Sequence, residues 1–133
     1  MTTATKTNGT KYISDLHFEH QVWLNTLQFC KDEIAIFERR MGELATRNTD
    51  KALLAELEHF QNQYIRQREV IDVLRHDIKQ HENFLEKESK EHATAIDHRG
   101  FGDHTELRNQ MVTFEKLYRE LKDEFYRWVA TSM

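Results

Sequence analysis

The sequence predicts an all-α protein, an antiparallel three-helix bundle or coiled coil with a long central helix and staggered ends. Two features of composition support this class, because the 133 residues include no proline and only 4 glycines. The third is periodicity, since large apolar side chains recur at alternating spacings of three and four along three long segments. That spacing places side chains on one face of a helix, whereas strands alternate faces with period two. The chain is therefore expected to be mostly helical.

The N-terminal part of the chain predicts a tail followed by the first helix. Residues 1–12 are polar, lack the apolar stretch of a signal peptide, and are expected to be flexible. The first helix is predicted over residues 14–47, with Ser14 as its N-cap. Residues 13–133 are expected to form one domain.

The central helix is predicted over residues 50–96. Asn48 is expected to end the preceding helix in a left-handed conformation, and Thr49 is expected to cap the new one. No proline or glycine interrupts this segment. It should therefore run for about 45 residues.

The third helix is predicted over residues 103–132. Gly100–Gly102 interrupts the apolar pattern and is interpreted as the second turn. Asp103 and Glu106 then have the spacing of a capping box at the start of the new helix.

These two turns predict that the third helix stops short of the first hairpin. The first helix would cover roughly residues 50–83 of the central helix, and the third roughly residues 68–97. A set of large apolar side chains at the hairpin end would then lack a third helix to cover them. They are Phe37, Met41, Leu44, Leu53, Leu57, Phe60 and Tyr64.

An uncovered apolar stripe of this size predicts an interface. Each exposed large side chain forgoes about 1.5–3 kcal/mol of burial, and such patches usually mark binding surfaces. We expect two-fold homodimerisation to complete the bundle, with a partner helix as another possible occupant. The leading function is thus a non-enzymatic interaction or scaffolding module without a cofactor. The competing prediction is a kinked central helix that closes the bundle as a monomer.

The histidines predict an alternative function. By the expected register, His17, His20, Asp77 and His81 converge where all three helices meet, with Tyr118 opposite them. Two or three imidazoles with a carboxylate would suit zinc or iron, which predicts a metal-binding helical bundle. The competing interpretation is a hydrogen-bonded polar layer that fixes the helix register.

The other histidines and the single cysteine receive structural interpretations. His92, His98 and His104 cluster around the predicted second turn and are expected to be exposed there. Cys30 lies on the apolar stripe, which favours a small buried hydrophobic side chain over a nucleophile. A lone cysteine cannot form an internal disulfide, and a cytoplasmic location is expected.

Charge and hydropathy argue against two classes of partner. The chain has 19 Lys and Arg against 23 Asp and Glu, whereas nucleic-acid-binding proteins usually show a basic surplus or face. A nucleic-acid-associated regulator is therefore only the third hypothesis. No apolar run approaches the ~18 residues of a membrane span. No catalytic triad or phosphate-binding glycine loop occurs, so the chain is not expected to be an enzyme.

Overall fold

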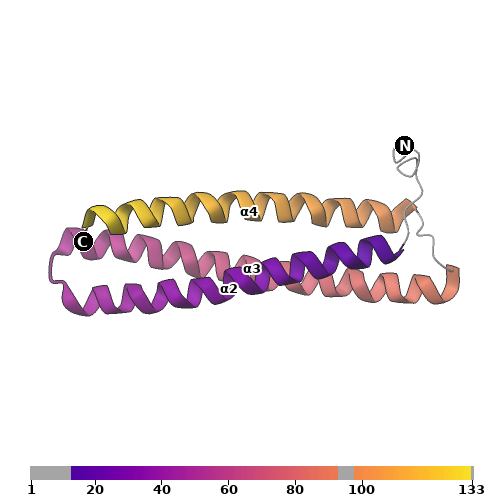
Figure 1. Ribbon diagram of the computed structural model, residues 1–133, viewed down its shortest axis with the longest axis horizontal. Coiled ribbons are helices and arrows are strands. Elements are labelled where there is room, and N and C mark those ends of the chain that lie inside the picture. The colour runs from indigo at the N-terminus through magenta and orange to yellow at the C-terminus, as the bar shows by residue number, and fades with distance from the viewer. Residues whose placement is uncertain (1–12, 93–97, 133) are drawn as a thin grey trace. The chain divides into compact units, whose positions relative to one another are not determined.

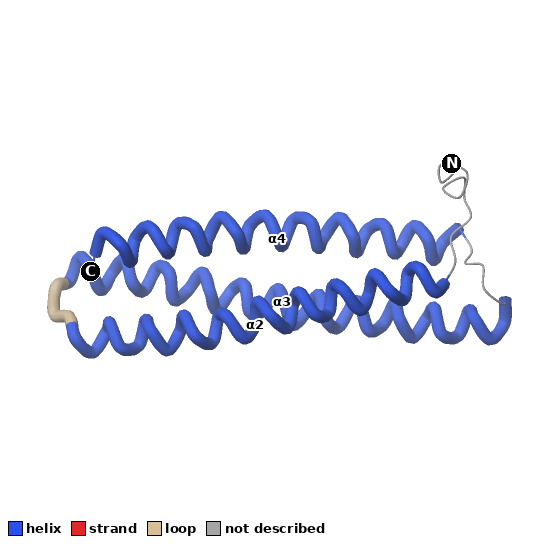
Figure 2. The backbone as a smooth tube through the Cα atoms, in the orientation of Figure 1, coloured by secondary structure: helices blue, strands red, loops and turns tan. Residues whose placement is uncertain are grey.

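The computed structural model describes residues 13–92 and 98–132, and almost all of them are helical (Figures 1 and 2). The three helices are α2 (Ile13–Arg47), α3 (Lys51–His92) and α4 (His98–Ser132). These ranges contain no strand, and the predicted all-α three-helix class is confirmed. No helix within them combines the length and the apolar character needed to cross a membrane. The predicted N-terminal tail, 1–12, lies outside the described residues.

The helices divide into two compact units, and each helix contributes a section to both. Among the described residues, unit 1 consists of 13–26, 73–92 and 98–111, and unit 2 consists of 27–72 and 112–132. Each unit is thus built from three helical sections around a core of its own. Unit 1 holds the candidate site, and unit 2 holds most of the large aromatic side chains.

The boundaries of the first hairpin differ from the predicted ones by about one residue. α2 begins at Ile13, so Ser14 lies in its first turn instead of capping it. The N-cap of α3 is Asp50 and not Thr49, because the Asp50 carboxylate accepts the backbone N–H of Ala52 at 3.0 Å. Asn48 donates its side-chain amide to the carbonyl of Leu44 at 2.8 Å, which satisfies one of the open carbonyls at the end of α2.

The start of α4 differs more. The helix already begins at His98, so Gly100–Gly102 is helical and the predicted turn there is wrong. The predicted capping box of Asp103 and Glu106 is wrong for the same reason. A glycine costs a helix about 1 kcal/mol relative to alanine, which disfavours the helix without forbidding it. Here Gly100 is buried, and its carbonyl is hydrogen-bonded to His81 at 3.1 Å.

This earlier start changes the register of α4 along α3. In unit 2 the Phe60 ring lies 5.4 Å from Phe125 and 5.3 Å from Trp128, both in α4. Tyr64 likewise contacts Tyr118 and Phe125, although the predicted register placed it beyond the reach of the third helix. The third helix therefore extends along the hairpin end of unit 2.

The expectation of an uncovered hairpin end is wrong as a result. Of the seven side chains named for it, only Leu53 is half-buried, and the other six are buried within a single chain. The buried six are Phe37, Met41, Leu44, Leu57, Phe60 and Tyr64. Homodimerisation remains a prediction, but these side chains no longer support it.

Candidate metal centre

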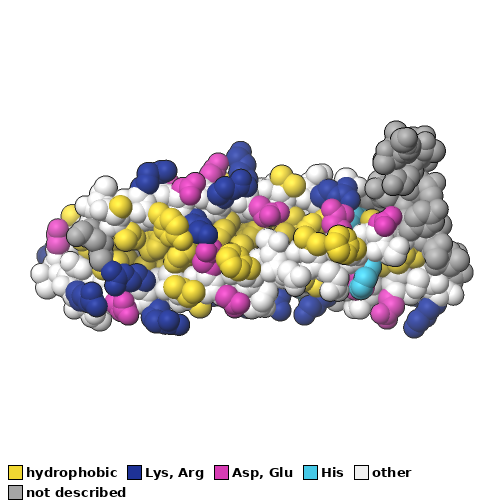
Figure 3. Space-filling model, in the orientation of Figure 1, with side chains coloured by type: hydrophobic (Ala, Val, Ile, Leu, Met, Phe, Trp, Pro, Cys, Tyr) yellow, Lys and Arg dark blue, Asp and Glu magenta, His cyan; other side chains and the backbone are white. Residues whose placement is uncertain are grey.

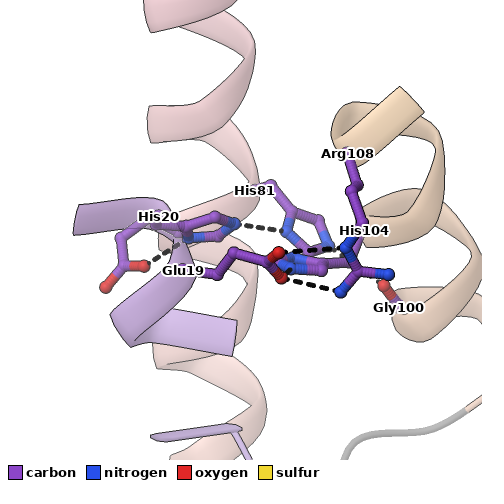
Figure 4. A network of polar contacts seen from close by, with 7 residues as sticks. Glu19, His20, His81, Gly100, His104 and Arg108 are labelled. Atoms are coloured by element: carbon purple, nitrogen blue, oxygen red, sulfur yellow. Dashed lines mark hydrogen bonds and ion pairs between the residues drawn. The ribbon is translucent and has the colours of Figure 1, made fainter. Parts of the chain in front are cut away.

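Three buried histidines, one from each helix, meet in unit 1 (Figure 4). His20 comes from α2, His81 from α3 and His104 from α4, and their exposed fractions are 0%, 7% and 0%. One ring nitrogen from each lies within 4.8 Å of the other two. His20 Nε2 and His81 Nδ1 are 3.1 Å apart, close to the ~3.3 Å between nitrogens in a tetrahedral site with Zn–N bonds of about 2.0–2.1 Å.

The outer nitrogens of two of these rings are held by carboxylates. His20 Nδ1 lies 2.7 Å from Glu82 Oε1, and His104 Nε2 lies 2.7 Å from Glu19 Oε1. An ionised carboxylate only accepts hydrogen bonds, so each of these ring nitrogens must carry the proton. A neutral imidazole has one N–H, which leaves the inner nitrogen of each ring with a free lone pair.

His81 is oriented in the same way by the backbone. Its Nε2 lies 3.1 Å from the carbonyl oxygen of Gly100, so Nε2 donates and Nδ1 faces the cluster as a lone pair. The Nδ1 of His104 is buried and has no hydrogen-bond partner among the described residues. Each of the three rings is thus held by an oxygen through one nitrogen and has a lone pair on the other, as is usual for metal-binding histidines.

Glu19 and Glu82 are themselves fixed as anions. Arg108 binds Glu19 through two hydrogen bonds of 2.9 and 2.7 Å, which lowers the pKa of the Glu19 carboxyl to about 2. Burial raises the pKa of Glu82, but hydrogen bonds from His20 and His17 outweigh burial and lower it overall. Both carboxylates therefore remain acceptors at neutral pH.

The three histidines are kept neutral. Burial is the largest influence on each ring and lowers the pKa of His20, His81 and His104 below 6.5, that of His104 to about 4. The hydrogen bonds to Glu82 and Glu19 oppose this shift without cancelling it. Near pH 7 the inner nitrogens are thus unprotonated, and their lone pairs are available to a metal cation.

Aromatic rings pack against the cluster and limit its contact with water. Trp23 stacks on His104 with centroids 4.8 Å apart and planes inclined by 25°. Phe84 stacks on His81 at 5.8 Å. Such packing restricts the ring rotations that would take the inner nitrogens out of position.

The structure brings together only part of the predicted histidine site. His20 and His81 meet as expected, whereas His17 is half-exposed and bonded to Glu82 on the outer side of His20. Asp77 lines a pocket that reaches His81 and is not a member of the cluster. Tyr118 lies in unit 2, where its hydroxyl donates to a carboxylate of α2.

His104 is the member that the sequence interpretation missed. It was expected to be exposed at a turn, but it is fully buried in α4. The sequence does contain a signal, because His104, Leu107, Met111 and Phe114 continue the same spacing of three and four. The expected exposure of His92 and His98 concerns side chains outside the described set.

Comparisons of the chain with family models, with curated proteins and with solved structures give no match.

Proposed function

We propose that the protein binds one divalent transition-metal ion, with Zn²⁺ as the first choice, through His20 Nε2, His81 Nδ1 and His104 Nδ1. The observation that carries this proposal is the buried, unpartnered Nδ1 of His104, in a ring that has a nitrogen within 4.8 Å of ring nitrogens of His20 and His81. A buried acceptor without a partner costs about 1–3 kcal/mol. A bound metal ion would remove this cost, because it would accept the lone pairs of all three nitrogens.

The same geometry favours a metal over the hydrogen-bonded polar layer. A layer needs a proton between His20 Nε2 and His81 Nδ1, which are 3.1 Å apart. Both rings already use their N–H on an oxygen, so the layer would need an additional proton. Burial lowers the pKa of both rings and so opposes that proton. Imidazole lone pairs suit Zn²⁺, Cu²⁺, Ni²⁺ and Fe²⁺, of which Zn²⁺ most readily accepts a four-coordinate site.

The ion would also stabilise unit 1, because each ligand comes from a different helix. A bound ion would connect α2, α3 and α4 within this unit and add its binding free energy to the folded state. The proposed function is therefore a metal-binding helical bundle whose unit 1 gains stability when loaded.

Titration of untagged, chelator-treated protein with Zn²⁺ by calorimetry, together with elemental analysis, tests this function. The wild type should take up one equivalent. His104→Phe keeps an aromatic ring against Trp23 but removes a ligand, so stoichiometric uptake should disappear. His76→Gln is the matched control at an exposed histidine, and it should bind like the wild type. Equal uptake by His104→Phe, or no stoichiometric uptake by the wild type, would contradict the proposal.

A second candidate function, an interaction module acting by homodimerisation, is favoured by exposed apolar side chains. Figure 3 shows hydrophobic side chains gathered over α2 and α4 on the face drawn. In unit 2, Phe29 and Ile36 of α2 are 63% and 56% exposed, and Val112 and Tyr126 of α4 are 61% and 49% exposed. Apolar side chains as exposed as these support an interaction surface.

Native mass spectrometry tests this second candidate. A dimer would have twice the 16.0 kDa of the chain, and Ile36→Glu should reduce it to the monomer. Asn62→Glu, at an exposed polar position of α3, should leave the mass unchanged. A wild-type monomer across the micromolar range would rule the dimer out. The partner helix, the cytoplasmic location and the absence of enzymatic activity stay predictions.

A further inference from the structure

A pocket in unit 1 opens next to the histidine cluster. It has a volume of about 350 Å³, and it is bounded by α3 and α4. His81 is part of its wall, together with the carboxylates of Asp77, Asp103 and Glu106. The pocket is shallow and largely open to solvent, so a small molecule can reach it directly.

The three histidines leave one position of a four-coordinate ion without a ligand. Structural zinc sites usually have four protein ligands, whereas sites with three keep the fourth position for water or another molecule. The group of potential ligands in the described part of the chain consists of the three histidines and no fourth residue. Glu19 and Glu82 are engaged by the outer ring nitrogens. The fourth ligand must therefore come from outside this set.

His81 connects the cluster to the pocket. It is the most exposed of the three residues, at 7% against 0% for His20 and His104. The Asp103 carboxylate, across the pocket on α4, is near enough to raise the pKa of His81, against the larger effect of burial. A molecule in the pocket would thus approach the ion from the His81 side.

The charge of the pocket limits which molecules can enter. Its described lining includes three carboxylates and neither lysine nor arginine. A surface of one sign in a concave site attracts counter-charges and repels ions of its own sign. Cations and neutral molecules can therefore enter more readily than anions.

We propose that the fourth coordination position of the metal opens into this acidic pocket and takes a small neutral donor, water or an imidazole-like molecule, while the carboxylates keep anions out. This inference rests on the proposed metal site, and it makes that site ligand-binding as well as structural.

Cobalt-loaded protein tests the inference, because the d–d absorption of Co²⁺ reports its ligands. Imidazole is the neutral probe and azide the anionic one, with cobalt retention checked by elemental analysis after gel filtration. Millimolar imidazole should change the spectrum of the wild type, and the same concentration of azide should not. Asp103→Asn combined with Glu106→Gln should increase azide affinity at least tenfold.

The matched control is a variant that also loses two negative charges, at positions far from the pocket residues in sequence. Glu120→Gln with Asp123→Asn alters two exposed carboxylates of unit 2, and azide affinity should stay as in the wild type. If the protein takes up cobalt but neither probe alters its spectrum, the fourth coordination position is not open to the pocket. The proposed metal binding would still stand. Equal affinity for azide in the wild type and the pocket variant would overturn the charge selection. A chain that takes up no cobalt would overturn both the inference and the proposed function.

Discussion

His20 Nε2 lies 3.1 Å from His81 Nδ1, and each ring bonds an oxygen through its other nitrogen. If both imidazoles are neutral, their lone pairs point at each other, and a cation bound between them would stabilise this arrangement. His104 adds a third lone pair without a partner of its own among the described residues. The carboxylates and the backbone carbonyl around the rings therefore matter as much as the rings, because they determine which nitrogen faces inward.

Replacing the carboxylate behind His104 should weaken metal binding without removing a ligand. Glu19→Gln keeps an acceptor oxygen but loses the negative charge that holds His104 Nε2–H and Arg108. Loss of such an outer partner typically reduces metal affinity about 10- to 100-fold. Competition with a chromogenic zinc chelator measures the change, and Glu120→Gln is the control. An unchanged affinity would mean that Glu19 does not orient the ring.

The metal-free protein should lose stability in mild acid. Burial lowers the pKa of the three cluster histidines from 6.5, that of His104 to about 4. Between these pH values the unfolded chain binds protons that the folded chain does not. The contribution of the neutral histidines to the free energy of unfolding is complete above pH 6.5 and is lost as the pH falls toward 4. At about 1.4 kcal/mol per pKa unit, His104 alone accounts for up to about 3 kcal/mol.

Urea unfolding followed by circular dichroism at several pH values from 7.5 to 4 measures this loss. Glu19 acts in the same direction at lower pH, because its pKa is lowered to about 2 and its contribution disappears as the pH falls below 4.5. His104→Phe should show a smaller loss than the wild type between pH 6.5 and 4, and His76→Gln should show the same loss. A free energy of unfolding that is constant over this range would contradict the burial of neutral histidines.

Cys30 should be unreactive while unit 2 is folded. The thiol is buried, with 6% of the residue exposed, and burial raises its pKa from 9.0 to about 11. Because the thiolate is the reactive form, this shift alone slows alkylation about 100-fold. Iodoacetamide labelling at pH 8, followed by mass, should be slow without urea and fast in urea. Rapid labelling of the folded protein would show that unit 2 opens readily.

Removing the Tyr118 hydroxyl should moderately destabilise unit 2. The hydroxyl donates to Glu33 Oε1 at 2.7 Å, and Lys122 binds the other oxygen of that carboxylate at 2.6 Å. A hydrogen bond to a charged group contributes about 1.5–3 kcal/mol, so Tyr118→Phe should lower the free energy of unfolding by this amount. Tyr126→Phe, at a half-exposed ring, is the control and should change it little. A neutral Tyr118→Phe would mean that water replaces the hydroxyl at Glu33.

The sequence predicts the helices and the first hairpin well because the determinants there are local. A short polar segment joins α2 to α3, which sets their register to within about one helical turn. His20 and His81 were therefore expected near each other, and they do meet.

The register of α4 could not be obtained in the same way, because it depends on tertiary contacts. The glycines at 100 and 102 predict a turn, but burial of His104 against Trp23 and the bond from His81 to the Gly100 carbonyl favour a helix there. A helix that starts at 103 places Tyr118, and not His104, beside the other histidines. It also leaves Phe60 and its neighbours without the cover of α4.

Phe60→Glu distinguishes the two registers directly. In an uncovered seam, a charge at Phe60 would dissociate a dimer and leave the chain folded. In the structure Phe60 is 5% exposed and packs against Phe125 and Trp128, so a carboxylate there would be buried without a partner. The free energy of unfolding should fall by at least about 4 kcal/mol, as expected for an unpaired charge in a core. Asn62→Glu, at an exposed polar position of α3, should change stability by no more than about 0.5 kcal/mol. Urea unfolding and native mass spectrometry of both variants measure stability and mass together, and a Phe60→Glu chain as stable as the wild type would show that α4 does not cover this position.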